Sequence, residues 1–256
     1  MRRAILILTF FLFLTSFITC IAAGTMHKDV SAVSADGFNI KATFDYPKIK
    51  GKKEYSTVVL LHSLGYSSQW WETLPDELLK SGYAVLNIDL RGHGESVYNS
   101  QLVRTSWKNM TNKAYAKYPD DVIAIINTIK SENSKKKFFE NWAIVGADIG
   151  ANTAVLLADK VAEKPKTIVM LSPTIDVKGL YIPVSLAHLD NTDCFAISGT
   201  NDFDSEKAIN YLKKFAQAGF VAYKSESKST GVLMLKNDNS LTKIITTWLK
   251  DYLDSK

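Results

Sequence analysis

The chain has 256 residues, which is enough for one domain with a full hydrophobic core. Its 31 basic and 26 acidic residues nearly balance, and the densest basic run, Lys135–Lys137, fits a solvated loop better than a nucleic-acid interface. The sequence shows no internal repeat, low-complexity tract or metal-ligand spacing, so we expect no solenoid, nucleic-acid partner, metal or other cofactor.

The N-terminal segment differs from the rest of the chain. Arg2 and Arg3 precede an apolar run from Ala4 to Ile21, and the small residues Ala22–Gly24 follow. A charged start, an apolar centre and a small-residue end are typical of an export signal. We therefore predict a signal peptide over residues 1–24 and a single domain over residues 25–256.

Two alternatives remain for this segment. The apolar run is about long enough to span a membrane as an uncleaved anchor. Cys20 is alternatively the lipidated cysteine of a lipoprotein signal, although Phe17–Thr19 matches the usual approach to such a cysteine poorly. All three interpretations predict an exported protein of the periplasm or cell envelope, and the two alternatives add membrane association through the N-terminal segment or Cys20. Beyond the predicted signal peptide, Cys194 is the one cysteine, so a chain without that segment forms no internal disulfide.

The predicted elements alternate along the chain. Residues 29–46 alternate apolar and polar around Asp36–Gly37, which predicts a β-hairpin. Short apolar runs predict strands over residues 57–61, 83–89, 141–145, 166–171, 193–198 and 220–223. Helical patterns follow over residues 69–80, from 118, from 151, over 205–218 and over 240–253. Alternating strands and helices predict an α/β protein with a mainly parallel sheet covered on both faces, whose site lies at the carboxyl ends of the strands.

The turn between the strand at 141–145 and the following helix organises this pattern. In Gly146-Ala147-Asp148-Ile149-Gly150, small residues stand two positions either side of a polar one. This is the pattern of a nucleophile elbow, where the chain turns so sharply that only glycine avoids a clash. The central residue of such an elbow is usually serine, and here it is Asp148.

Four motifs follow predicted strands in a fixed order: His62–Gly65, Asp89–Ser96, Gly146–Gly150 and Gly199–Asp202. With these motifs the chain resembles the α/β-hydrolase superfamily, particularly small bacterial esterase-like and serine-aminopeptidase-like members with little or no cap. The resemblance covers about residues 30–253 and implies the α/β-hydrolase fold.

The resemblance also implies positions for the catalytic groups. The nucleophile position falls on Asp148 and the acid position on Asp202. The oxyanion donors would be the backbone N–H groups of Leu64 and Ile149. The histidine position, in the loop before the last helix, holds Thr230, so the acid is kept while nucleophile and base are both replaced.

These replacements predict a hydrolase fold that has lost its chemistry. Asp148 has no hydroxyl to acylate, and as a carboxylate it would occupy the place where a substrate oxyanion forms. Its charge would be satisfied by the same N–H donors. We therefore favour an exported, catalytically silent protein whose pocket binds an ester, amide or lipid-like small molecule, or a protein.

The alternative is an active hydrolase. Haloalkane dehalogenases and epoxide hydrolases use aspartate at this position, but a histidine must then activate the water that hydrolyses the ester intermediate. Ile149 replaces the tryptophan that often follows their aspartate, and residues 172–192 are too few for their cap. A relocated base such as His188, expected over the same end of the sheet, would also restore activity.

Several neighbouring side chains have expected structural roles. His62 is expected to orient the oxyanion loop and His93 to stabilise its own glycine-rich loop. Ser63 stands where many relatives have glycine, which weakens the oxyanion assignment. Trp70 and Trp71 begin a predicted helix near the pocket mouth. One of them is a candidate to line the pocket, although packing into the core is the commoner fate of a tryptophan.

Overall fold

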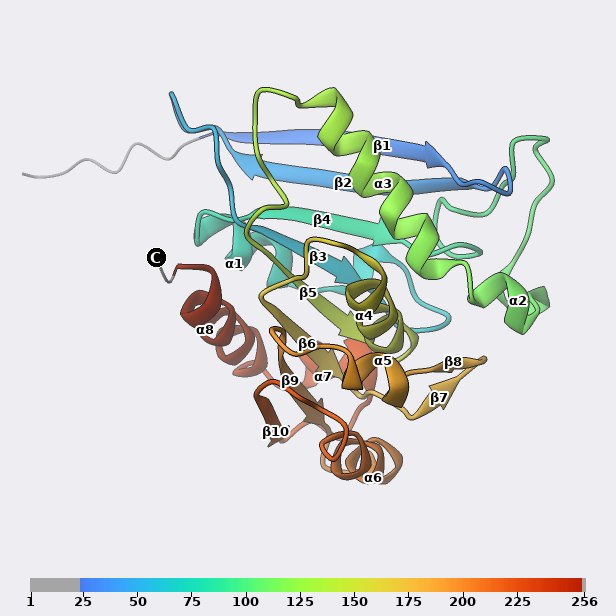
Figure 1. The fold of residues 1–256 in the computed structure, drawn as a ribbon, viewed down its shortest axis with the longest axis vertical. Coiled ribbons are helices and arrows are strands. Elements are labelled where there is room, and N and C mark those ends of the chain that lie inside the picture. The colour runs from blue at the N-terminus through green and yellow to red at the C-terminus, as the bar shows by residue number, and fades with distance from the viewer. Residues whose placement is uncertain (1–23, 255–256) are drawn as a thin grey trace, which may run out of the picture.

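One eight-stranded sheet organises residues 24–254, which are the residues described by the computed structural model (Figure 1). The predicted signal peptide lies outside these residues, apart from its last residue, Gly24. The sheet opens with the predicted hairpin, in which β1 (Thr25–Val33) pairs antiparallel with β2 (Asn39–Pro47). The strand order is β1-β2-β4-β3-β5-β6-β9-β10.

The sheet is mostly parallel, as the sequence predicts. β2 also runs antiparallel to β4, and every pair from β4 to β10 is parallel. These strands are β3 (Thr57–Leu61), β4 (Ala84–Asp89), β5 (Trp142–Ala147), β6 (Thr167–Leu171), β9 (Asp193–Ser198) and β10 (Phe220–Lys224). Their carboxyl ends therefore meet at one edge of the sheet, which gathers the loops that follow them.

Helices cover both faces of the sheet (Figure 1). They are α1 (Leu74–Lys80), α2 (Asn112–Tyr115), α3 (Tyr118–Glu132), α4 (Ile149–Lys160), α5 (Pro183–Ala187), α6 (Phe203–Leu212), α7 (Met234–Asn237) and α8 (Leu241–Leu253). The 3-10 turns are η1 (Ser68–Trp70), η2 (Trp107–Asn109) and η3 (Gly231–Leu233). α3, α4 and α6 contribute to the core on one face, and α1 and α8 to the core on the other.

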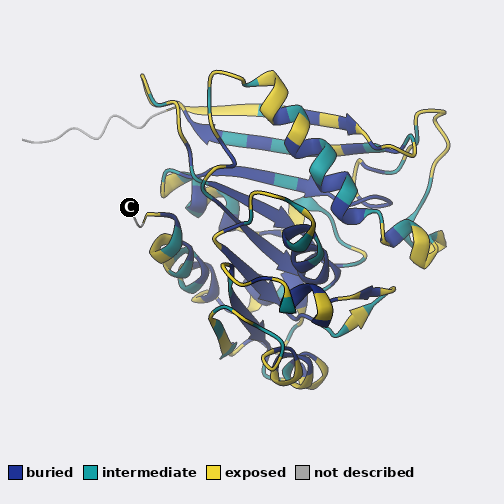
Figure 2. Cartoon of the chain, viewed as in Figure 1, coloured by how far each residue is buried: buried dark blue, intermediate teal, exposed yellow. Residues whose placement is uncertain are grey.

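The two cores follow from the period of a strand. Val59 and Leu61 of β3 belong to one cluster of buried side chains, and Val58 and Leu60 to the other. Successive side chains of a strand point to opposite faces, so a strand buried on both faces reads as a continuous apolar run. Figure 2 shows the same division, with buried strands at the centre and exposed residues on the outer faces of the helices.

The segment between β6 and β9 forms no large cap. It holds the two-stranded pair β7 (Asp176–Val177) and β8 (Leu180–Tyr181), followed by the short helix α5. A fold with little cap is therefore confirmed. Across residues 24–254, none of the helices combines the length and the apolar character that crossing a bilayer requires.

Two predicted helices are shorter than expected. The helix expected over residues 69–80 is divided into η1 and α1, with Glu72 at a positive φ of 50° between them. Pro75 explains the division, because proline fits only the first turn of a helix and α1 must therefore begin just before it. α6 ends at Leu212 rather than at residue 218, because the chain turns there to enter β10.

Candidate functional site at the carboxyl ends of the strands

The connection from β5 to α4 is the sharp turn that the sequence predicts. Asp148 has φ 51° and ψ −116°, a backbone conformation that residues other than glycine rarely adopt. A Cβ at Gly146 would lie 2.3 Å from the carbonyl oxygen of Gly150, and one at Gly150 would lie 1.9 Å from that of Leu61. Both glycines are therefore required by close backbone contacts, and the turn raises Asp148 above the end of β5.

The carboxylate of Asp148 is held by the two groups predicted to be oxyanion donors. The backbone N–H of Leu64 donates to Oδ2 of Asp148 over 3.1 Å. Burial raises the pKa of Asp148, the N–H groups of Leu64 and Ile149 oppose this rise, and the charge of Asp202 adds to it. The donors that would stabilise a substrate oxyanion therefore contact the protein's own anion.

Asp202 lies in the loop after β9, where it caps the N-terminus of α6. Its Oδ1 accepts a hydrogen bond from the backbone N–H of Ser205 over 3.3 Å. Its Oδ2 is buried and has no hydrogen-bond partner in the described part of the chain, and the residue is only 9% exposed. In a triad this oxygen would face the histidine, and in the described part of the chain it faces no donor.

The loop that carries Thr230 converges on the elbow. Thr230 itself is exposed, and its side chain makes no cap hydrogen bond to η3. The next residue, Gly231, has φ +56°, and a Cβ there would lie 3.4 Å from Cβ of Asp148 and 2.3 Å from Oγ of Ser63. The structure thus brings Asp148, Asp202 and this loop to one end of the sheet.

Two serines hold this last loop in place. Oγ of Ser63 accepts from the N–H of Val232 over 2.9 Å, and Oγ of Ser172 accepts from the N–H of Gly231 over 2.7 Å. The sequence reasoning missed the role of Ser172, which directly follows β6 and has φ 52°. A polar residue at the carboxyl end of a predicted strand was the signal that could have identified it.

His62 uses both ring nitrogens within the scaffold. Nε2 accepts from the N–H of Leu90 over 3.0 Å, so Nδ1 carries the proton and donates to the carbonyl of Ser63 over 2.8 Å. Burial, with a smaller contribution from the charge of His93, lowers the pKa of His62 to about 4. The ring is therefore neutral at pH 7 and orients the oxyanion loop rather than serving as a base.

His93 is committed in the same way. Nε2 accepts from the N–H of Gly65 over 2.9 Å, and Nδ1 lies 3.1 Å from the carbonyl oxygen of Arg91, to which it donates. Burial lowers the pKa of His93, and the ring stacks on Trp107 with an interplanar angle of 3°. This imidazole joins the glycine-rich loop to the oxyanion loop.

His188 lies at the opposite end of the sheet from the elbow, so its predicted position over the same end is wrong. Its Nδ1 contacts Oδ1 of Asp159 at 3.1 Å, and the side chain is 59% exposed. Asp159 is near the last residue of α4, about 15 Å along the helix from the elbow. The loop before a parallel strand leads to its amino end, and His188 precedes β9.

A cavity of about 280 Å³ lies beside the oxyanion loop. Gly65, Tyr66, Trp70, His93 and Trp107 are among the residues that line it. Trp70 is 41% exposed and contributes to this wall, whereas the adjacent Trp71 is 1% exposed and packs into the core. The two tryptophans, indistinguishable in the sequence, therefore have different roles.

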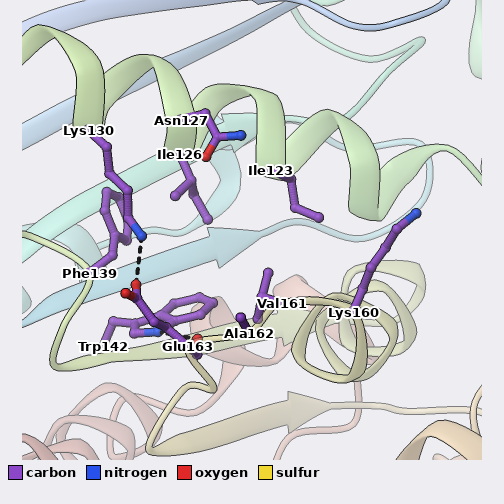
Figure 3. A pocket seen from close by; sticks show the side chains of 10 residues that line it. All are labelled: Ile123, Ile126, Asn127, Lys130, Phe139, Trp142, Lys160, Val161, Ala162 and Glu163. Carbon is purple, nitrogen blue, oxygen red and sulfur yellow. Dashed lines mark hydrogen bonds and ion pairs between the residues drawn. The ribbon is translucent and has the colours of Figure 1, made fainter.

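A second groove, of about 350 Å³, lies at the amino end of the sheet between α3 and α4 (Figure 3). Apolar side chains such as Ile126, Phe139 and Trp142 form its floor. Its lysines are ion-paired, Lys130 with Glu163 and Lys160 with Asp120. The groove contains no residue of the elbow. Nowhere in residues 24–254 do three or more histidine, cysteine or acidic side chains form a group that could hold a metal.

Comparison with known proteins identifies the family and the fold. The sequence model of the family described as serine aminopeptidase, S33, matches residues 52–193. The chain is similar in structure to dienelactone hydrolase from Anabaena variabilis, with a TM-score of 0.68, 15% identity, and coverage of 90% of this chain and 99% of that one. It is also similar to an esterase from Pyrococcus furiosus, with a TM-score of 0.64, 20% identity, and coverage of 89% and 93%.

A further similar structure is larger than this chain. Acylaminoacyl peptidase from Pyrococcus horikoshii gives a TM-score of 0.69 at 12% identity, covering 91% of this chain and 42% of that one. At such identities these likenesses establish the fold alone. None of the curated proteins is similar enough in sequence to match the chain.

Proposed function

The chain belongs to the serine aminopeptidase S33 family of α/β-hydrolases, and we propose that it retains the hydrolase scaffold without hydrolysing acyl bonds. The observation that carries this proposal is the hydrogen bond from the N–H of Leu64 to Asp148. An oxyanion hole contributes to catalysis only if its donors are free for the charge that develops on the substrate. Here a resident carboxylate engages them.

The distribution of imidazoles supports the same proposal. All four histidines of the sequence lie within the described residues. His62 and His93 use both ring nitrogens for backbone groups, His188 pairs with Asp159, and His27 of β1 pairs with Asp45. None is available beside Asp148, so a triad-like proton acceptor is missing from the elbow.

This arrangement also weighs against Asp148 as a working nucleophile. An aspartate that attacks carbon forms an ester, and a base must then activate water to release it. Thr230 is no base near pH 7, and the imidazoles are committed elsewhere. We expect such an attack to stop after one turnover, with the ester intermediate still attached to Asp148.

We further propose a binding role for an exported protein. The cavity beside the oxyanion loop, with Trp70 and Trp107 in its wall, is large enough for a small ligand. We propose an ester, amide or lipid-like molecule as the ligand, because proteins of similar structure include an esterase and a peptidase. The Arg2–Arg3 start and the apolar run Ala4–Ile21 support export to the periplasm or cell envelope.

Turnover assays test the proposal. The purified protein and its Asp148→Ala variant are assayed with short-chain p-nitrophenyl esters, aminoacyl amides and haloalkanes. We expect no turnover above the rate of the variant. Turnover that Asp148→Ala abolishes would reject catalytic silence, and a stoichiometric burst followed by arrest would identify Asp148 as a nucleophile without a deacylating base.

A gain of function tests the positions themselves. Combining Asp148→Ser with Thr230→His supplies a hydroxyl at the predicted nucleophile position and an imidazole at the predicted histidine position, and it frees the N–H of Leu64. We expect measurable p-nitrophenyl acetate hydrolysis from the double variant and none from either single variant, because the two groups act as a unit. Activity that is equal in the double and single variants would contradict the assignment of Thr230.

A further inference from the structure

Seven lysines gather on one surface at the amino end of the sheet. Four come from the loop after β2 and three from the loop after α3: Lys48, Lys50, Lys52, Lys53, Lys135, Lys136 and Lys137. Two backbone hydrogen bonds join the loops, from the N–H of Lys137 to the carbonyl of Lys53 over 2.8 Å and from the N–H of Tyr55 to the carbonyl of Lys137 over 2.9 Å. We call this set the amino-end lysine surface. It unites two segments that lie far apart in the sequence.

The positive charge of this surface is largely uncompensated. Only Lys137 forms ion pairs, with Glu54 at 3.5 Å and Glu140 at 3.0 Å. The other six lysines have no ion pair within residues 24–254, so seven lysines face two carboxylates. This surface therefore carries a concentrated positive field on a chain whose overall charge is +5.

Two tyrosines support the lysine stems. Nζ of Lys136 lies 4.4 Å from the ring centroid of Tyr46 and donates to its hydroxyl over 3.1 Å. Nζ of Lys52 lies 4.9 Å from the ring of Tyr55. Both rings are buried, at 7% and 3% exposure, so they position lysines and are not free to stack on bases.

The same surface surrounds the point where the chain enters the fold. The backbone N–H of Lys48 donates to the carbonyl of Gly24 over 2.6 Å. Thr25 pairs with Pro47 in the register of β1 and β2, which places both beside the lysine-bearing loop (Figure 1). The apolar run Ala4–Ile21 ends shortly before Gly24 in the sequence. The part of the fold that follows the predicted export segment thus lies beside a basic surface.

We propose that the amino-end lysine surface binds the anionic phospholipid headgroups of a membrane. Clustered lysines beside an apolar segment are attracted to an anionic bilayer, and lysine stems can reach the headgroups from a rigid base. The lysines lie at the amino ends of the parallel strands, so the bound domain presents its opposite end, with Asp148, to the aqueous side. A nucleic acid is less suited, because the surface offers no exposed aromatic platform among the described residues.

Vesicle binding tests the proposal. The chain starting at Gly24 contains every element of the described fold and lacks the apolar run, so its binding reports the folded surface alone. It is sedimented with vesicles of phosphatidylcholine, either pure or mixed with phosphatidylglycerol, at low and high salt. We expect binding only to the anionic vesicles, with loss at high salt because screening weakens exposed charges.

A matched pair of variants locates the surface. Lys48→Gln, Lys50→Gln, Lys53→Gln and Lys135→Gln together remove four lysines that make no ion pair in the described structure. The control combines Lys207→Gln, Lys213→Gln, Lys214→Gln and Lys228→Gln, which remove equal charge near the β10 edge. At about fivefold per lysine, the first variant should weaken partitioning about 600-fold if the four contributions add, and the control should weaken it much less. Far-ultraviolet circular dichroism checks that both variants are folded.

Four outcomes would overturn the proposal. They are equal binding to neutral vesicles, no loss in the first variant, equal loss in both variants, and tighter binding to duplex DNA than to anionic vesicles. None of these outcomes bears on the elbow, because the assay needs no turnover and changes no residue there. The proposal therefore stands or falls separately from catalytic silence.

Discussion

The two ends of the sheet use polar residues in opposite ways. At the carboxyl end, most polar groups have internal partners: Leu64 donates to Asp148, and His62 and His93 bind backbone groups. Oδ2 of Asp202 is an exception that the described residues show at this site. At the amino end, lysine side chains project into solvent, and Lys137 alone among the seven is ion-paired within the described residues. Both ends are assembled from distant segments, but internal partners for the polar groups predominate at the carboxyl end alone.

The difference shows what a site needs beyond the right positions. The carboxyl end has the sharp turn at Asp148, and the N–H of Leu64 beside it already has an internal acceptor. Donors that already have internal acceptors stabilise the fold and are not free for a substrate oxyanion. Charges without internal partners, as at the amino end, retain their capacity to bind an external anion.

Replacing a glycine of the elbow should have the largest effect. Gly150→Ala would place a methyl group 1.9 Å from the carbonyl oxygen of Leu61, so β3 and α4 must separate. We expect a loss of roughly 3 kcal/mol or more in the free energy of unfolding, measured by urea denaturation. Gly24→Ala, which has open space around it, is the control and should change stability little. Equal stability of the two variants would mean that the close contact at the carboxyl end is not a constraint.

Removing one hydroxyl should have an intermediate effect. Ser63→Ala leaves the buried N–H of Val232 without its acceptor, which costs about 1–3 kcal/mol. Ser67→Ala in the same loop is the matched control, because no hydrogen bond of its side chain is found in residues 24–254. Urea denaturation of both variants measures the difference. If Ser63→Ala unfolds no more readily than its control, the hydrogen bond from Val232 to Ser63 contributes less to the free energy of unfolding than we infer.

Neutralising Asp148 should stabilise the protein in a pH-dependent way. Because burial raises its pKa in the folded state, the charged carboxylate costs stability at neutral pH, and this cost disappears as pH falls towards the ordinary pKa of about 3.9. Asp148→Asn keeps an oxygen for the N–H of Leu64 but carries no charge. We expect its melting temperature to exceed that of the unchanged protein by roughly 2–4 °C at pH 7.5, or about 1 kcal/mol.

The pH series supplies the control for this effect. The advantage of Asp148→Asn should shrink steadily from pH 7.5 to pH 4, because the unchanged protein becomes protonated at the elbow. A constant advantage across this range would indicate relief of backbone strain instead of charge. A disadvantage at neutral pH would show that the N–H donors more than offset the burial of the carboxylate.

The smallest expected effects test the independence of the two ends. The four-lysine variant of the amino end should leave the melting temperature within about 2 °C of the unchanged protein, since exposed lysines contribute little to stability. Asp148→Asn should leave binding to anionic vesicles unchanged. A variant at one end that alters the property of the other would show that the two ends are coupled.

The architecture and the position of the elbow could be predicted from local sequence patterns. Period-two and continuous apolar runs predicted the hairpin and the buried strands, because burial of one or both faces dictates these patterns. Gly146 and Gly150 around Asp148 predicted the sharp turn, because backbone contact there excludes any side chain. Pro75 likewise marks the start of α1 in the sequence, because proline is tolerated only in the first turn of a helix.

Which distant residues contact one another could be seen only in the folded chain. His188 was expected beside the elbow and lies at the other end, because the direction of a parallel strand places the preceding loop at its amino end. Ser172 stands at the end of a predicted strand, but its partner in the last loop, like the pairing of Lys48–Lys53 with Lys135–Lys137, comes from a distant segment. Local sequence encodes periodicity and backbone constraint, whereas partners for charges and donors arise only when distant segments pack together.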